Sequence, residues 1–418
     1  MKSTLLNITV LAWLLVWIVS GPVVGQNQLT WYKGNLHTHT YWSDGDEFPE
    51  MVLDWYQSNR YDFIALSDHN TIARDEKWVR VKKSPLYEES FRKYIDRFGA
   101  DWVQYKTDSG RITVKLKTFE EYKGKMGSDR FLIIPSEEIT GSVGNKPIHV
   151  NATNIRNFIP PPKANTIAQA MQQSVDAVVK QRAETGQSML PHINHPNFFW
   201  SVTIEDMISL HGERFFEVYN GHPMVFNYGD SLHPGTEIIW DRINIAYAGR
   251  RQPLLYGLAT DDSHNYHEFG KAFSNAGRGW IMVLAGALRA DSLIQAMEAG
   301  RFYASTGVTL KQIEYENNEL RVAIAPETGV KYVIEFIGVE KNENNSRVLK
   351  TTHGEIGSFA LKEDYLFVRA RITSSKLKPN PFHEGDFEMA WTQPVTWGIH
   401  KYLRYAFWFS KTLINPVL

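Results

Sequence analysis

The 418-residue sequence contains no cysteine. This absence excludes disulfides, thiolate zinc sites, a cysteine nucleophile and a lipidated cysteine. Any transition metal must therefore be held by imidazole and carboxylate groups. The sequence also lacks an excess of either charge, with 45 Lys and Arg, 46 Asp and Glu, and a formal net charge of -1. This balance argues against a nucleic-acid-binding groove or a generally basic membrane-binding face.

Residues 1–25 have the pattern of a secretory signal peptide. Lys2 supplies a positive charge, Leu5–Val19 is apolar apart from two residues, and small residues precede Gln26. We therefore predict a periplasmic or secreted protein with no stable membrane insertion after cleavage. An uncleaved anchor is the alternative, for which the apolar run is short.

Residues 30–307 alternate short β-rich runs with helical patterns, which predicts an α/β domain built as a parallel barrel. Several runs are continuously apolar, as strands covered on both faces are. The predicted strands are Trp31–His39, Asp62–Ser67, Phe131–Ser136, Ile148–Ala152, Met189–Ile193, Phe215–Asn220, Leu254–Thr260 and Trp280–Leu284. The predicted helices include Phe48–Asn59, Thr166–Glu184 and Ala290–Ala299.

Three further segments differ from this pattern in residue composition. Residues 75–130 are charged and aromatic, which indicates an insertion with a helix and a hairpin near Arg111–Lys117 that covers the pocket. Residues 308–398 contain short alternating runs between Asn, Gly, Glu and Lys, typical of a small antiparallel β-sandwich. Residues 399–418 form an apolar, aromatic tail that we expect to pack on a domain rather than on a membrane.

Residues that can bind metals follow almost every predicted strand. In a strand, positions i and i+2 face the same side, so the two imidazoles of a His-Thr-His sequence can reach one ion. The turn sequence Ser-Asp-Gly that follows can return a carboxylate to the same ion. The candidates are His37, His39, Asp44, Asp68, His69, Glu137, Glu138, His149, His192, His195, Asp262 and His264.

Each candidate also has a structural explanation. Alone, His149 fits a hydrogen-bonded core histidine, and Asp44 fits a turn residue or helix cap. Together, six histidines and three carboxylates at strand ends exceed the roughly four ligands of one zinc ion. The carboxyl ends of barrel strands are where a barrel active site is built. The set therefore predicts two or three divalent ions.

These motifs, in this order, resemble those of the PHP (polymerase and histidinol phosphatase) superfamily over about residues 31–270. The resemblance implies a distorted seven-stranded (β/α) barrel with a trinuclear metal site. It places His37, His39, Glu138 and Asp262 around one pair of ions, and Asp44, His69, His149, His195 and His264 around the rest of the cluster. Many relatives have His where this chain has Asp44, so manganese or iron becomes as plausible as zinc. The segments 301–307 and 390–394 resemble a carbaryl-hydrolase-like branch.

The predicted function is that of an exported metal-dependent hydrolase acting on a small ester. Two ions would lower the pKa of a bridging water, and the resulting hydroxide would attack a phosphorus or carbonyl centre. Phosphoester hydrolysis is the first hypothesis, carboxylic or carbamic ester hydrolysis the second, and a non-catalytic metal- or glycan-binding module the third. We expect Asp68 or His192 to move a proton. Arg278 is either an anion-binding residue or an exposed loop residue.

Overall fold

A large mixed β-sheet forms the centre of the molecule. The computed structural model describes residues 29–398, so the predicted signal peptide and tail lie outside the described residues. Within this range thirteen strands pair in the order β10-β9-β8-β7-β6-β2-β1-β11-β12-β19-β18-β15-β16. They are β1 (Thr30–Asn35), β2 (Phe63–Leu66), β6 (Leu132–Val143), β7 (Lys146–Thr153), β8 (Leu190–Ile193), β9 (Phe215–Asn220), β10 (Tyr256–Thr260), β11 (Trp280–Ala285), β12 (Phe302–Ser305), β15 (Tyr332–Glu340), β16 (Arg347–His353), β18 (Tyr365–Leu377) and β19 (Phe387–Thr392).

The β10 end of this sheet returns to β1. Thr38, just beyond β1, forms a parallel bridge with Ser263, just beyond β10. The His39 amide donates to the Ser263 carbonyl at 2.9 Å, and the Asp262 amide donates to the His37 carbonyl at 3.0 Å. These contacts bring the first and last metal-binding motifs together. A fully closed barrel stays a prediction, because the contact between the ends of β1 and β10 involves fewer residues than an ordinary pair of hydrogen-bonded strands.

The prediction that all barrel strands run parallel is wrong for β7, and also for β11, which pairs antiparallel with β1. Strands β1, β2 and β6 are parallel neighbours, as are β8, β9 and β10, but β7 pairs antiparallel with both β6 and β8. β6 and β7 form a hairpin that turns at Gly144-Asn145. A parallel connection needs a crossover of about a dozen residues or more, which this short segment does not provide.

Helices cover the sheet as expected from their apolar spacing. They are α1 (Pro49–Ser58), α4 (Ile167–Thr185), α5 (Ile204–Ile208), α6 (Thr236–Gly249) and α7 (Ala290–Glu298). Thr166 caps α4 by accepting a hydrogen bond from the Gln169 amide, and Gly186 ends it in the left-handed conformation. None of the helices among residues 29–398 is long and apolar enough to cross a membrane.

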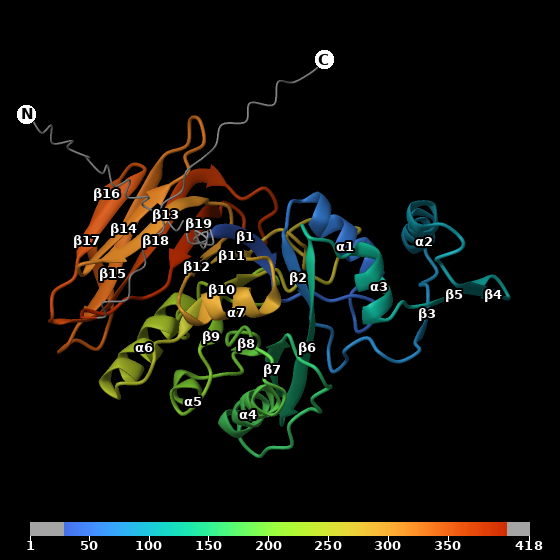
Figure 1. The fold of residues 1–418 in the computed structure, drawn as a ribbon, viewed down its shortest axis with the longest axis horizontal. Helices are drawn as coiled ribbons and strands as arrows, with labels where there is room; N and C mark the ends of the chain where they lie inside the picture. The colour runs from blue at the N-terminus through green and yellow to red at the C-terminus, as the bar shows by residue number, and fades with distance from the viewer. Residues whose placement is uncertain (1–28, 399–418) are drawn as a thin grey trace, which may run out of the picture.

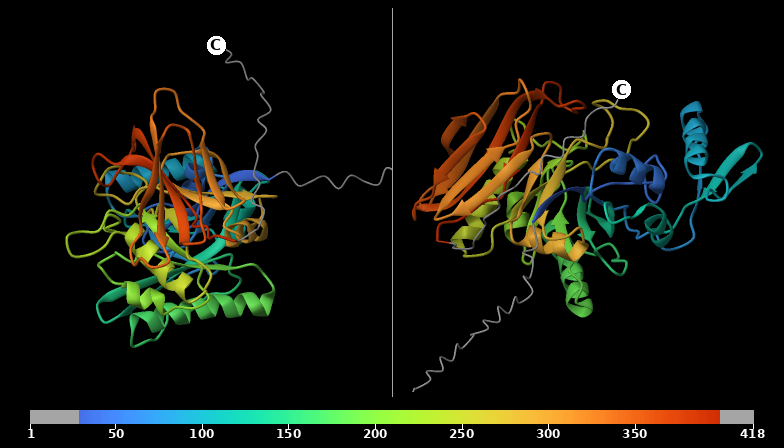
Figure 2. Two further views of the ribbon diagram at one scale, coloured as in Figure 1. Left: turned by 90° about the vertical axis from the view of Figure 1, so that its left-hand side faces the viewer. Right: turned by 45° about the horizontal axis from the view of Figure 1, so that its top comes forward.

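Residues 75–130 form a lobe at the side of the sheet. It contains α2 (Pro85–Phe98), α3 (Phe119–Met126) and a small antiparallel sheet of β3 (Trp78–Arg80), β5 (Arg111–Lys115) and β4 (Tyr105–Asp108). The helix and the hairpin near 111–117 are therefore present. Figures 1 and 2 show α2 and β3–β5 projecting at the end opposite the C-terminal strands. Tyr94 and Trp102 of this lobe donate to the buried Glu50 carboxylate of α1 at 2.8 and 2.6 Å.

The C-terminal strands pack as two layers. The small sheet of β13 (Leu310–Glu316), β14 (Glu319–Ile324) and β17 (Ile356–Ala360) faces β15 and β18 across a shared apolar core. Strand β19 pairs with β12, so the second layer continues the large sheet (Figure 1). The predicted antiparallel sandwich is therefore joined to the preceding domain by strand pairing.

A buried ion-pair network ties α6 to β18. Arg369, which is 1% exposed, donates to both oxygens of Asp241 at 2.8 and 2.9 Å and lies 3.0 Å from Glu237. Removing one partner leaves buried charge without compensation, which costs several kcal/mol. We expect Arg369→Met to lower the free energy of unfolding by about 3 kcal/mol. Urea denaturation should show this loss, whereas Arg321→Met, which breaks an exposed pair with Glu319, should change little.

A second buried carboxylate makes stability depend on pH. Glu213 lies just before β9 and accepts a hydrogen bond from the Tyr247 hydroxyl of α6. Burial raises the pKa of Glu213 to about 7. The folded protein therefore holds a proton that the unfolded chain releases, and this contribution to stability is lost as the pH rises through about 7. Glu213→Gln should flatten the fall in urea midpoint between about pH 5 and pH 8. An equally steep fall in the variant would contradict this assignment.

Candidate metal centre

Two histidines just beyond the end of β1 line the buried side of the site. His37 and His39 are both 0% exposed. The Asn35 side chain accepts a hydrogen bond from the His37 amide at 3.0 Å, which fixes the turn of the chain after the strand. Their alternate positions bring both imidazoles to one side, with ring centroids 5.1 Å apart. The i, i+2 spacing therefore gives the shared direction that the sequence predicted.

Glu138 lies at the centre of the cluster and is 0% exposed. Its Oε1 is 3.2 Å from His37 Nε2 and 3.0 Å from His149 Nδ1, and its Oε2 is 3.5 Å from His39 Nε2. His195 Nε2 lies 3.6 Å from the same Oε1. One carboxylate thus faces imidazoles from three separate segments of the chain, an arrangement that fits a metal ligand.

Asp262 completes the inner part of the site. Its Oδ1 lies 3.2 Å from both His37 Nε2 and His39 Nε2. Asp262 has a φ of 49°, in the left-handed region that residues other than glycine rarely adopt. Such strain persists where surrounding contacts hold it, and here the bridge between the β1 and β10 ends provides them.

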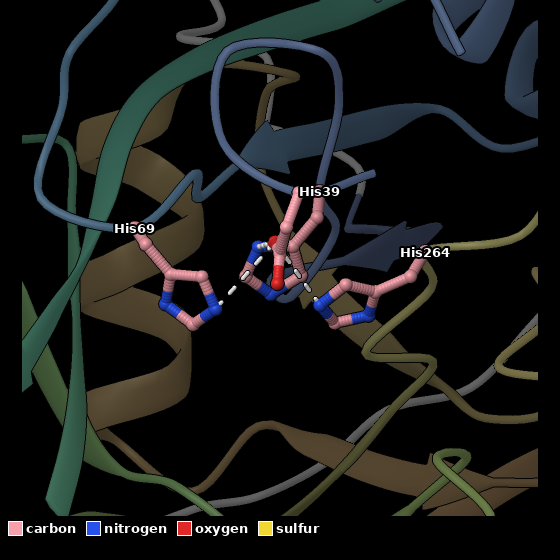
Figure 3. Close-up of side chains that lie close together, drawn as sticks. His39, His69 and His264 are labelled. Atoms are coloured by element: carbon pink, nitrogen blue, oxygen red, sulfur yellow. Dashed lines mark ion pairs between the residues drawn. The ribbon is translucent and has the colours of Figure 1, made fainter. Parts of the chain in front are cut away.

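A second, more open group surrounds Asp44. Its Oδ1 lies 3.4 Å from His264 Nε2, 3.6 Å from His69 Nε2 and 3.7 Å from His39 Nδ1. Figure 3 shows His39, His69 and His264 directed toward this shared point. The Asp44 side chain is 58% exposed, whereas the other group is closed to solvent. A substrate would therefore reach the cluster from the Asp44 side.

The buried carboxylates of the site require positive charge beside them. Burial alone would raise the pKa of Glu138 and of Asp262, but the facing imidazoles hold both well below the usual range. Burial opposes protonation of His69, yet Glu138 and Asp44 raise its pKa to about 11. Burial, together with His264 and His69, lowers the pKa of His39 to about 3, so the ring is neutral near pH 7 and keeps one nitrogen lone pair free to bind a metal. Protons or divalent ions must therefore balance these buried carboxylates.

The donor separations fit shared metal ions. Two atoms bound to one tetrahedral ion at about 2.1 Å lie roughly 3.4 Å apart. The distances between His37, His39, Glu138 and Asp262 are 3.2 to 3.5 Å, and those around Asp44 are 3.4 to 3.7 Å, close to this value. His37 Nε2 and His39 Nε2 are buried without a hydrogen-bond partner, which is costly unless something else binds them. These residues therefore fit a cluster of divalent ions.

The structure brings all nine predicted ligands together. Each belongs to at least one group whose donor atoms lie within 4.8 Å of one another: His37, His39, Asp44, His69, Glu138, His149, His195, Asp262 and His264. Glu137, the neighbour that we did not select, points elsewhere and accepts a hydrogen bond from the Ile159 amide at 2.7 Å. Their roles as ligands stay predictions.

Two other predicted residues, Asp68 and His192, lie outside the nine-residue set. Asp68 accepts hydrogen bonds from the Thr40 amide at 2.7 Å and from the Ser43 hydroxyl at 2.6 Å, so it organises the loop that carries Asp44. His192 is 0% exposed and lies behind His37, with its Nε2 3.5 Å from Glu217. No contact on the described residues assigns either one a proton-transfer role, which stays a prediction.

Arg278 is neither exposed nor directed at the cluster. It is 2% exposed, and its guanidinium donates to the carbonyls of Gly221, Gly270, Phe273 and Asn380. The expectation of an exposed loop arginine is therefore wrong. The predicted anion-binding role stays untested, but these hydrogen bonds give Arg278 a structural part in holding the loops beside β10.

Sequence reasoning missed two residues of the site. Glu217 lies in the middle of the apolar strand β9 and its Oε1 is 2.6 Å from His37 Nδ1. His222 follows β9, with its ring 5.6 Å from that of His264. A carboxylate inside a predicted buried strand was an available signal, because such a group is rarely buried without partners. His222 stands alone in a loop and gave no comparable signal.

No protein-family model matches the chain, and no curated protein matches it either. Several solved structures, in contrast, match the chain. A two-domain protein from Bacteroides vulgatus, described as containing a predicted PHP-like metal-dependent phosphoesterase, is 15% identical, with 88% of this chain and 96% of that one covered at a TM-score of 0.39. A proposed metal-dependent phosphoesterase from Bifidobacterium adolescentis is 12% identical, with 56% and 88% covered at a TM-score of 0.31.

An amidohydrolase from Chromobacterium violaceum, solved with sulfate and without metal, is 11% identical, with 56% of this chain and 87% of that one covered at a TM-score of 0.29. The structures that resemble the chain thus include PHP-like metal-dependent phosphoesterases. The resemblance to a carbaryl-hydrolase-like branch stays a prediction.

Proposed function

We propose that the chain is a metal-dependent hydrolase that cleaves phosphoester bonds of a small molecule. The observation that carries this proposal is the convergence of nine imidazole and carboxylate side chains at separations suited to shared ions. His37, His39, Glu138 and Asp262 would hold one pair of ions, and the remaining five residues would complete a cluster of two or three. Zinc, manganese and iron all suit imidazole and carboxylate donors.

Divalent ions bound there would supply an activated water and would stabilise negative charge on the substrate. The protein excludes bulk water on one side, where His37, His39 and Glu138 are fully buried, and leaves Asp44 exposed on the other. This asymmetry gives a substrate one direction of approach, toward His69 and His264.

We infer that His222, whose ring lies 5.6 Å from that of His264, would hydrogen-bond a reacting oxygen. Its Nδ1 accepts a hydrogen bond from the Met224 amide at 3.1 Å. Burial, partly offset by Asp262, lowers the pKa of His222 to about 4, so the ring is neutral near pH 7. A neutral histidine that accepts at Nδ1 carries its proton at Nε2 and can donate from there. A donor at this position would favour a transition state with charge on oxygen.

Phosphate release from a panel of mono- and diesters, assayed with added Mn²⁺ or Zn²⁺, tests the proposal. We expect activity that requires metal and that His37→Ala reduces together with the metal content. Purified protein that binds metal and hydrolyses no phosphoester would overturn the phosphoesterase assignment.

Carboxylic or carbamic ester hydrolysis is the second candidate, and an aromatic wall favours it. The Phe198 ring lies 4.9 Å from that of His195, and Trp200 stacks on Phe226 at 4.8 Å. Phe199 and Phe226 are 50% and 45% exposed at the rim. Phe199 and Trp200 both have a φ of 51°, and Lys146 Nζ donates a hydrogen bond to the backbone carbonyl of each. Such a wall suits an apolar ester, and faster cleavage of aryl carboxylic esters than of aryl phosphates would support this candidate.

We also propose that the protein is exported, on the strength of the pattern in residues 1–25. Fractionation of cells that express the full chain, with the N-terminal residue of the mature protein determined by sequencing, tests this. An intact Met1 on protein retained in the cytoplasm would contradict it.

A further inference from the structure

A buried carboxylate behind the proposed metal centre contacts two of the proposed ligands and is linked to a third through one intervening side chain. Glu217, in β9, is 0% exposed. Its Oε1 lies 2.6 Å from His37 Nδ1, and its Oε2 accepts the His195 amide at 2.9 Å. Oε2 also accepts from Asn220 Nδ2 at 2.8 Å, and the same Asn220 amide group donates to Asp262 Oδ2 at 3.1 Å.

The three ligands reached in this way form one metal-binding group. His37, His195 and Asp262 have donor atoms within 4.8 Å of one another. The contact with His37 is direct, the contact with His195 is through the backbone, and the contact with Asp262 passes through Asn220. No other described carboxylate outside the nine ligands makes these three connections.

Glu217 is itself a poor candidate for a ligand, although it also groups with His37 and His192. Two atoms on one tetrahedral ion would lie roughly 3.4 Å apart, whereas Glu217 and His37 are at hydrogen-bonding distance. Thr260 Oγ1 also donates to Oε1 at 2.8 Å, so each carboxylate oxygen already accepts two hydrogen bonds.

We propose that Glu217 is a positioning residue that fixes His37, His195 and Asp262 for metal binding. The inference rests on the proposed metal centre. A carboxylate can only accept hydrogen bonds, so His37 must donate from Nδ1 and leave the lone pair of Nε2 directed at Glu138 and Asp262. Hydrogen bonds of this kind fix the tautomer and ring orientation of metal-binding histidines.

The variant Glu217→Gln tests the inference. A glutamine has one oxygen and one NH₂ group, so two of the four donors would face another donor. If NH₂ faces His37, the ring must accept at Nδ1 and carry its proton at Nε2, where a metal would bind. If NH₂ faces His195 and Asn220, the backbone of the second ligand loses its partner. Both orientations therefore disturb the metal-binding group of His37, His195 and Asp262.

Calorimetric titration of metal-free protein with Mn²⁺, and separately with Zn²⁺, is the measurement. We expect Glu217→Gln to raise the Kd by about 10- to 100-fold, the range typical of such partners. Glu213→Gln, which changes a buried glutamate just before the same strand, should bind like the wild type. Circular dichroism and the melting temperature of the metal-free protein show that each variant is folded before its affinity is compared.

Asn220→Ala gives an independent test if Glu217→Gln does not fold. It removes the link between Glu217 and Asp262, and with it the hydrogen bond that Asn220 Oδ1 accepts from the His222 amide at 2.8 Å, but it leaves the contacts of Glu217 with His37 and His195. We therefore expect a smaller loss of affinity, by about tenfold. Wild-type affinity in the folded Glu217→Gln variant, or in Asn220→Ala where the first does not fold, overturns the positioning role and leaves the proposed function intact. A wild-type protein that binds neither Mn²⁺ nor Zn²⁺ overturns both.

Discussion

Replacing Glu138 by glutamine is expected to lower the turnover of a cleaved ester by roughly 10³-fold and to release bound metal. Glu138 faces His37, His39 and His149 at 3.0 to 3.5 Å. The change removes a negative charge that neutralises the ions and replaces one oxygen by an NH₂ group that cannot bind a cation. An ion contributes several kcal/mol of charge stabilisation in a hydrolytic transition state, which corresponds to this loss of rate.

Glu137→Gln is the matched control because the two residues are adjacent on β6 and face opposite directions. Glu137 is also 0% exposed, but its Oε1 accepts the Ile159 amide. Metal content by mass spectrometry and turnover of the best ester should both fall in Glu138→Gln and stay near wild type in Glu137→Gln. Equal losses in the two variants would show that Glu138 acts through folding rather than through the ions.

The contrast between these two glutamates shows what the sequence could predict. The residue type at a strand end and the alternation of side chains identify a carboxylate that can face a pocket. Strand alternation alone does not say which of two adjacent glutamates faces inward, and the resemblance to the PHP superfamily made that choice for Glu138. The same alternation placed His37 beside His39 correctly, because both lie on one strand extension.

The direction of β7 was open to prediction, because Gly144-Asn145 leaves only a two-residue turn between β6 and β7, and such a short turn joins antiparallel strands. The run Ile148–Ala152 also alternates apolar residues with His149 and Asn151, which is typical of antiparallel strands. His149 nevertheless reaches Glu138, since Thr140 of β6 lies opposite His149 in the hairpin. A wrong strand direction therefore left the predicted ligand set unchanged.

Glu217 was missed because its function depends on partners from other strands. Its partners come from segments around residues 37, 195, 220 and 260. Nothing near Glu217 in the sequence shows that its carboxylate lies at hydrogen-bonding distance from His37. The environment of Arg278 was equally invisible in the sequence. This charged residue follows the metal-binding motifs in the chain, but its guanidinium donates to the backbone carbonyls of other loops.

Removal of metal with a chelator is expected to abolish hydrolysis and to lower the melting temperature by roughly 10 °C. A ligand that binds only the folded state stabilises it by about 4 kcal/mol when present at 1,000 times its Kd. In a domain of this size each kcal/mol corresponds to about 2–4 °C. The expected shift follows from these two values, and adding back Mn²⁺ or Zn²⁺ should restore both activity and melting temperature.

The shift should stay moderate because the metal-free site can hold protons instead. Burial opposes protonation of His37, but Asp262, Glu217 and Glu138 raise its pKa well above the usual value. Protonated imidazoles then pair with the carboxylates that the ions would neutralise, and the fold persists without catalysis. His37→Ala, with one ligand removed, should bind metal more weakly and show a smaller response to the chelator. An unchanged melting temperature and unchanged activity after complete metal removal from the wild-type protein would contradict a metal centre at these residues.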